Sequence, residues 1–147
     1  MMRHHLILRV ITKLLVGTIF LFALYVQFHG DYSPGGGFQA GVIMAVGFII
    51  YGIVFSLDKV KLVFPHWLVH KLVAFGVLLY AGTGVYSMLM GYGYLDYTAI
   101  DPHHPSHGQH LGILIVEAGV GITVTGVMVA VYYAFASRTP VLSDEEW

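Results

Sequence analysis

Glu117 is the residue with the clearest capacity for chemistry, because it is the only acidic side chain inside a long apolar stretch of this sequence. A carboxylate at membrane depth is costly, and such residues usually face a partner or a water-filled path. Gly121 and Thr125 follow it at helical spacing, which predicts a groove of small residues beside the carboxylate. Glu117 and Thr125 are therefore candidates for a proton or cation path. The alternative is a carboxylate that snorkels to the membrane surface or pairs with a lysine or arginine of a neighbouring subunit for assembly.

Three basic residues, Arg9, Lys13 and Lys71, lie near the ends of apolar stretches. Long basic side chains can bury their stems while the charge reaches the headgroup level, so this snorkelling is the expected arrangement. Lys13 lies deepest of the three. It is the one basic residue that we include among the ion-path candidates, where it would hold an acidic partner.

The segment 101–110 contains four of the nine histidines of the chain. Imidazole is the commonest nitrogen ligand for zinc and related ions, so a metal site formed by His103, His107 and His110 has to be considered. The prolines of this segment argue against the helical geometry that such a site would need. We therefore expect no metal and no cofactor, and we interpret these histidines as paired, helix-capping or proton-buffering groups.

The composition indicates that these residues lie in a membrane protein. Of the 147 residues, 57% are hydrophobic and 10% charged, and the mean hydropathy is +0.76. Soluble domains have about one quarter charged residues. A helix needs roughly 20 apolar residues to cross a bilayer, and four stretches meet this length, at about residues 6–28, 38–57, 68–90 and 111–136. The sequence therefore predicts an all-α integral membrane protein with a single domain, residues 1–147.

The distribution of lysine and arginine predicts the orientation. These residues occur near both ends of the chain and around the connection 58–67, and the connections 29–37 and 91–110 contain none. Because cytoplasmic loops are enriched in lysine and arginine, we expect the N and C termini to be cytoplasmic. Cysteine is absent from the sequence, which excludes disulfides and thiolate metal sites.

A polar segment rich in glycine separates the first two apolar stretches. Proline and consecutive glycines disfavour a continuous helix, so the chain must turn there. The residues expected to form this turn and the helix packing after it are Asp31, Pro34, Gly35, Gly36, Gly37 and Gly41. Gly112, Gly119 and Gly126 recur every seven residues and predict a close-packing face on the last helix. A small anion-binding concavity at the turn is the alternative interpretation.

The residues from Phe28 to Gly41 read FHGDYSPGGGFQAG. This string resembles the hallmark H-G-x-x-x-P-G-G-G-F-Q-x-G of the MrpB (or MnhB) family. Members of this family are small subunits of the multisubunit cation/proton antiporters of the Mrp or Mnh type. The likeness extends over almost the whole chain and includes the four spans, the long third connection and the Glu-bearing last helix. The string is also similar to the corresponding small subunit of membrane-bound hydrogenases and to part of the large antiporter subunit. The run 103–110 matches no motif of the family.

The resemblance implies a multi-pass subunit of the bacterial cytoplasmic membrane, in a complex that exchanges internal sodium for external protons. We accordingly expect a transporter subunit rather than an enzyme, which packs on the large antiporter subunit and supports Na+ efflux coupled to H+ uptake. Its expected partners are the other subunits, including the large ones that resemble complex I, together with lipid, Na+ and H+, and no nucleic acid. The alternatives are a structural or assembly subunit without an ion path, and the equivalent subunit of a membrane-bound redox complex.

Overall fold

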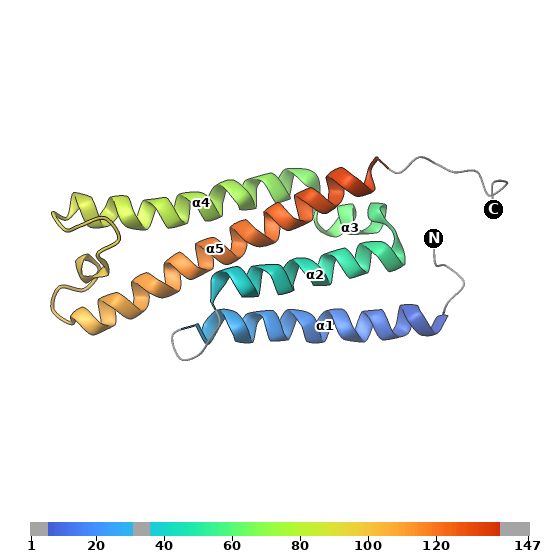
Figure 1. The fold of residues 1–147 in the computed structure, drawn as a ribbon, viewed down its shortest axis with the longest axis horizontal. Helices are drawn as coiled ribbons and strands as arrows, with labels where there is room; N and C mark the ends of the chain where they lie inside the picture. The colour runs from blue at the N-terminus through green and yellow to red at the C-terminus, as the bar shows by residue number, and fades with distance from the viewer. Residues whose placement is uncertain (1–5, 31–35, 139–147) are drawn as a thin grey trace.

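The computed structural model describes residues 6–30 and 36–138, and Figure 1 shows them as an elongated array of helices. The elements are α1 (Leu6–Phe28), α2 (Gly37–Phe55), α3 (Leu57–Val63), α4 (His66–Leu89), the 3-10 helix η1 (Tyr97–Ala99) and α5 (Pro105–Ala136). Four of them, α1, α2, α4 and α5, are long and apolar enough to cross a membrane. The described residues contain no β-strand. The predicted all-α class with four spans is confirmed.

The four long helices lie side by side in the order α1, α2, α5 and α4 (Figure 1). The central helix α5 packs along both α2 and α4 and crosses the array diagonally, whereas α1 packs mainly on α2. The last helix of the sequence is thus inserted between earlier ones. This topology brings Glu117 of α5 within reach of the connection between α1 and α2.

The last helix begins earlier than the sequence predicts, at Pro105 rather than near Leu111. Pro105 occupies the first helical turn, where a backbone N–H has no partner within the helix and its absence costs little. The prolines of this segment therefore precede or start the helix rather than interrupt it, and His107 lies inside α5. Glu117 consequently lies about three turns into the helix. A helix that began near Leu111 would place it less than two turns from the start.

The second connection, residues 56–65, is as long as the predicted loop 58–67 but begins two residues earlier, and it contains the short helix α3. Ser56 separates α2 from α3 with a φ of 118°. A buried cluster that includes Val60, Phe64 and Val129 holds α3 against α4 and α5. The hydroxyl of Tyr133 donates a hydrogen bond of 2.7 Å to the carbonyl oxygen of Phe64 and fixes the end of this connection.

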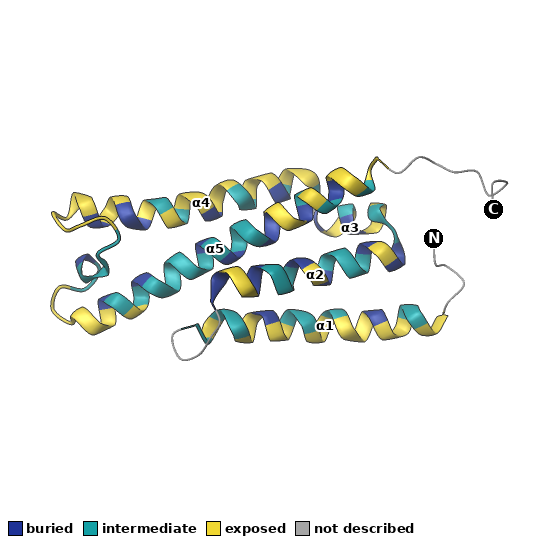
Figure 2. Ribbon diagram, in the orientation of Figure 1, coloured by how far each residue is buried: buried dark blue, intermediate teal, exposed yellow. Residues whose placement is uncertain are grey.

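The surface of the helix array is strongly apolar. Figure 2 shows the buried residues mainly where helices face one another, with exposed residues along the outer sides. Leu14 and Leu21 of α1 are 70% and 71% exposed, and many other large apolar side chains are also exposed. A membrane protein displays such a surface to hydrocarbon or to other membrane helices.

Every described lysine and arginine lies at the end of the array where α1 begins and α5 ends (Figure 1). These residues are Arg9, Lys13, Lys59, Lys61, Lys71 and Arg138. The opposite end contains the connection from α4 to α5, and the last turn of α1 and the first turn of α2 lie on that side of the array (Figure 1). The positive-inside rule predicts that the basic end is cytoplasmic.

Candidate functional site

Glu117 lies directly against the glycine turn. Its backbone carbonyl oxygen faces Gly37, the first residue of α2, and its carboxylate faces Gly30 and Gly36. A Cβ atom added to Gly36 would lie 2.7 Å from Oε1 of Glu117, and one added to Gly30 would lie 2.6 Å from the same oxygen. A side chain at either position would displace the carboxylate, which is the flexible end of the Glu117 side chain. The observed position of the carboxylate therefore depends on glycine at both positions.

The backbone of Gly36 adds a second requirement for glycine. Its φ is 108°, a conformation that residues with a Cβ atom rarely adopt. Its N–H donates a bond of 3.4 Å to the carbonyl oxygen of Val26, which ties the start of α2 to the last turn of α1. The backbone N–H of His29 donates to the same carbonyl oxygen at 3.3 Å. The turn beside Glu117 is therefore anchored on the end of α1.

Gln27 places a second polar side chain beside this site. Its Oε1 lies close to Gly121, where an added Cβ atom would be 2.5 Å away. Its buried Nε2 has no hydrogen-bond partner among the described residues. An unpaired buried amide donor is costly. This nitrogen is therefore a candidate contact for water or for a polar group of a partner. The side chain that carries it lies beside Gly121, which is one helical turn after Glu117 on α5.

The face of α5 that carries Glu117, Gly121 and Thr125 packs onto the first turns of α2. A Cβ atom added to Gly41 would lie 2.7 Å from the carbonyl oxygen of Gly121. The hydroxyl of Thr125 contacts the carbonyl oxygens of Gly121 and Gly41 at 2.7 Å and 3.2 Å. The groove expected beside Glu117 is thus filled by α2, and backbone carbonyls engage the Thr125 hydroxyl.

A cavity of about 540 Å³ lies between the helices next to this site. It is lined from α1, α2, α4 and α5, and its walls are almost entirely apolar, with Met44, Leu72 and Ile122 among them. Gln27 and Thr125 contribute the polar side chains of its lining. Such walls suit hydrocarbon better than a hydrated ion. The polar group formed by Glu117, Gln27 and the turn is therefore the candidate site, and the cavity is not.

Lys13 lies far from this site. Roughly 25 Å of α1 separates it from Gly30, at about 1.5 Å per residue. The Lys13 side chain is exposed, and its Nζ lies 5.8 Å from the centre of the Phe55 ring. The structure therefore does not bring together Lys13 and Glu117, although both are ion-path candidates in the sequence.

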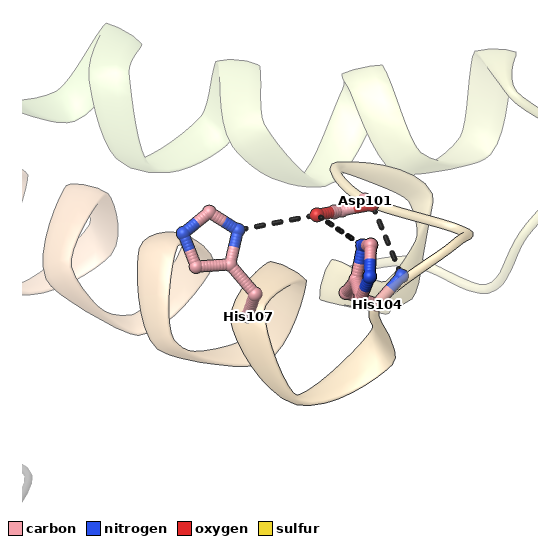
Figure 3. A network of polar contacts seen from close by, with 3 residues as sticks. All are labelled: Asp101, His104 and His107. Atoms are coloured by element: carbon pink, nitrogen blue, oxygen red, sulfur yellow. Dashed lines mark hydrogen bonds and ion pairs between the residues drawn. The ribbon is translucent and has the colours of Figure 1, made fainter.

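Figure 3 shows a polar network that links the connection before α5 to the first turn of α5, and the sequence analysis did not identify its aspartate. Oδ2 of Asp101 lies 3.1 Å from Nδ1 of His107 and 3.7 Å from Nδ1 of His104, and Oδ1 accepts the backbone N–H of His104 at 3.1 Å. Partial removal from water alone raises the pKa of Asp101. The hydrogen bonds from the His104 backbone and the His107 side chain outweigh it, so this pKa lies below its ordinary value. The signal in the sequence that could have predicted this network is Asp101 itself, an acidic residue four positions before the start of α5.

The described residues contain no group of three histidine, aspartate or glutamate side chains arranged to hold a metal ion. His103 precedes α5, whereas His107 and His110 lie in its first turns. His107 contacts Asp101 instead.

The glycines of the last helix lie against different neighbours. Gly112 lies against the ring of Tyr97 in η1, and an added Cβ atom on Gly119 would lie 2.9 Å from the carbonyl oxygen of Gly76 in α4. The corresponding position on Gly126 is 2.6 Å from a methyl carbon of Val73. Gly119 and Gly126 thus face α4. The remaining predicted turn residues, Asp31, Pro34 and Gly35, lie outside the described residues.

Comparison with known proteins points to one family. Residues 7–130 match the family model described as "Domain related to MnhB subunit of Na+/H+ antiporter". A Staphylococcus haemolyticus protein, provisionally named antiporter subunit mnhB2, is 31% identical over 138 residues, which cover 92% of this chain and 97% of the relative. The same provisional name applies to similar proteins of Staphylococcus epidermidis and Staphylococcus aureus, which are 31% and 32% identical over 133 residues, 89% of this chain and 94% of each relative.

Proposed function

Because the chain belongs to the family of the MnhB subunit of Na+/H+ antiporters, we propose that it packs on the large antiporter subunit and supports Na+ efflux coupled to H+ uptake. It is a multi-pass bacterial membrane protein and a component of a transporter, not a catalytic enzyme. Other subunits of the antiporter are accordingly its partners.

The contribution is a relay carboxylate. Glu117 takes up and releases a proton or a monovalent cation at the glycine turn, on the route by which ions reach the outer face. The observation that carries this proposal is the position of its carboxylate against Gly30 and Gly36, which carry no side chain to shield it. The nearby Nε2 of Gln27, without a partner among the described residues, supplies a donor for a water molecule beside the carboxylate.

The position of the site along the array agrees with this role. Glu117 lies near the end of α1 and the start of α2, away from the end that holds all described lysines and arginines. With the basic end in the cytoplasm, as the charge distribution predicts, the carboxylate is nearer the outer membrane surface. A proton entering from outside would meet it early in its passage.

A scaffold without an ion path is the second candidate, and the apolar lining of the large cavity favours it. In that case the exposed apolar helix faces would join transport subunits, and Glu117 would pair with a fixed cation of a neighbour. The two candidates differ in one respect that can be measured. A relay carboxylate is needed for transport after assembly, whereas a pairing carboxylate is needed for assembly itself.

The test uses a bacterial strain made sodium-sensitive by loss of its own antiporters and supplied with the complete set of antiporter subunits. We expect Glu117→Ala to abolish sodium tolerance while the complex still assembles, as judged by native gels of solubilised membranes. Gly82→Ala is the matched control, because an added Cβ atom there has no neighbour within 4 Å. Wild-type tolerance in assembled Glu117→Ala complexes would reject the relay, and loss of the complex would favour the pairing role.

A further inference from the structure

Three basic side chains from two helices converge on one aromatic ring at the basic end of the array. The ring belongs to Phe55, at the end of α2, which is 4% exposed and stacks on Tyr51 at 4.6 Å. Cζ of Arg9 lies 5.3 Å from the ring centre, and the Nζ atoms of Lys13 and Lys59 lie 5.8 Å and 6.0 Å from it. Arg9 and Lys13 are one turn apart on α1, and Lys59 is on α3.

These three positive charges have no acidic partner in residues 6–30 and 36–138. The ion pairs in those segments involve Asp101, in the connection before α5. Like charges gathered this closely repel one another, and attraction to a ring face offsets the repulsion only in part. A bound anion would remove the repulsion.

A cleft of about 350 Å³ lies at this cluster, lined by Arg9, Val54, Phe55 and Lys59. Its volume equals roughly twelve water molecules at about 30 Å³ each. Two of the lining residues are cationic and two are apolar and buried. The cleft therefore suits a ligand that combines an anionic group with hydrocarbon.

The helix surface beside the cleft is apolar and exposed. On α1, Val10, Ile11 and Leu14 are 51%, 47% and 70% exposed. Lys13 lies roughly 10 Å from the start of α1, a depth from which its long side chain reaches the headgroup level. A phospholipid in this position would place its phosphate at the cations and its acyl chains along α1.

We propose that Arg9, Lys13 and Lys59 bind the phosphate of an anionic membrane lipid at the end of the array where α1 begins. Clusters of basic residues at the membrane surface attract anionic lipids in this way. The phosphate bridges α1 and α3 and neutralises the cations above Phe55. The apolar surface of α1 distinguishes a lipid from free phosphate as the occupant.

The test is native mass spectrometry of the complete antiporter complex, purified in detergent and supplied with phosphatidylglycerol and phosphatidylcholine in equal amounts. We expect the wild type to retain phosphatidylglycerol selectively. The variant Arg9→Gln/Lys13→Gln/Lys59→Gln should lose this selectivity, by about fivefold for each cation removed. The matched control, Lys61→Gln/Lys71→Gln/Arg138→Gln, removes the same charge at the same end and should retain it.

Equal lipid selectivity in the wild type and the first variant would overturn the proposal, and so would equal loss in both variants. Displacement of the retained lipid by millimolar inorganic phosphate would also overturn it, because free phosphate would then suffice. Where the triple variant does not assemble, Lys59→Gln alone should still lower the selectivity about fivefold, and unchanged selectivity would count against the site.

Acidic residues of this chain's own C-terminal segment are a competing occupant. The variant Asp144→Asn/Glu145→Gln/Glu146→Gln separates the two possibilities. A lipid site predicts the same phosphatidylglycerol selectivity in this variant as in the wild type. Selectivity that appears only after these charges are removed would show that the segment fills the cleft, and the proposal would be wrong.

Discussion

The carboxylate of Glu117 lies where two glycines leave the backbone without side chains. Gly30 and Gly36 are far from Glu117 in sequence, yet a Cβ atom on either would meet its carboxylate. At Gly36 the positive φ of 108° makes any other residue unfavourable even without that contact. The geometry of one side chain thus depends on the absence of two others.

The first prediction concerns Gly36→Ala. This change places a Cβ atom against Glu117 Oε1 and forces an alanine into a strained backbone conformation, which costs about 1–3 kcal/mol. We expect a lower midpoint of thermal unfolding for the purified complex and loss of exchange activity. Gly82→Ala should leave both unchanged, since its added methyl group meets no other atom within 4 Å. A Gly36→Ala complex as stable and active as the wild type would contradict the described conformation of Gly36 and its contact with Glu117.

The second prediction concerns Asp101, whose pKa is lowered from an ordinary value of 3.8. A carboxyl group with a lowered pKa in the folded state contributes stability above its unfolded pKa and loses it as the pH falls through the folded pKa. We therefore expect the backbone amide of His104 to be protected from hydrogen exchange near neutral pH. Its protection should fall below about pH 4.

Asp101→Ala should remove this protection at every pH, because the acceptor is absent. Asp58→Ala, which changes an aspartate in α3 at the other end of the array, is the control and should leave the pH dependence intact. Protection of His104 that survives in Asp101→Ala would show that the network in Figure 3 does not hold this connection.

The sequence indicates which single residues are candidates for function better than it indicates the contacts between them. Glu117 is conspicuous as the one carboxylate in an apolar stretch, and the glycine turn is conspicuous by its composition. Their contact could not be predicted, because it depends on α5 lying between α2 and α4. The buried Nε2 of Gln27, which has no hydrogen-bond partner in the described part of the chain, was missed for the same reason, since burial of one side chain cannot be predicted from its neighbours in sequence.

At the scale of helices, close contacts between backbones define the array. α4 and α5 approach at Gly76 and Gly119, where each added Cβ atom would lie within 3.0 Å of the carbonyl oxygen of the other glycine. In lipid, where apolar burial does not drive helices together, such contacts contribute much of the association. The glycine spacing on the last helix predicted a packing face, and the structure assigns Gly119 and Gly126 to α4.

The third prediction follows from this crossing. Gly119→Ala should push α5 away from α4 and destabilise the chain by about 1–3 kcal/mol, the usual range for an overpacked contact. The measurement is the midpoint of unfolding of the purified chain in mixed micelles with increasing dodecyl sulfate. Gly17→Ala on α1, where no atom lies within 4 Å of the added Cβ, should not lower the midpoint. Equal midpoints for both variants would refute the crossing.

Helix boundaries were predictable where apolar stretches end in turn residues. Helix α1 has the expected limits, and α2 and α4, which correspond to the second and third predicted spans, differ from them by one or two residues at each end. The start of α5 was not predicted, because Pro105 is compatible with a first helical turn and the polarity of the following histidines suggested a loop. The length and hydropathy of a stretch predict the apolar part of a helix. They do not predict a polar extension of that helix beyond the membrane.

At the scale of the whole molecule, the basic residues, the Asp101 network and the apolar cavity lie in different parts of the array. The basic residues lie at one end, and the Asp101 network lies at the other, in the connection from α4 to α5. Glu117 lies at the glycine turn, beside a large cavity whose walls are almost entirely apolar. This separation predicts that an ion passes Glu117 at the edge of the subunit rather than through the cavity.

The fourth prediction tests the cavity. The chain has no cysteine, so Ala118→Cys in the cavity wall can be labelled specifically within the complex once the partner subunits are made cysteine-free. We expect no reaction with a charged, membrane-impermeant thiol reagent and ready reaction with a lipid-soluble maleimide. Met90→Cys, 53% exposed after α4, is the control and should react with both. Rapid labelling of Ala118→Cys by the charged reagent would indicate a hydrated path through the cavity.

The proposed role of this subunit in transport depends most on Glu117, and one measurement tests that residue directly. Cation-dependent proton movement is followed in inverted membrane vesicles that contain the complete complex, with the wild type and Glu117→Gln compared at equal amounts of assembled complex over a range of pH. Glutamine keeps the size of the side chain and removes its titratable charge. We predict loss of exchange or a shifted pH optimum in Glu117→Gln. Wild-type exchange with an unchanged pH profile would contradict the relay and assign this subunit to the scaffold of the complex.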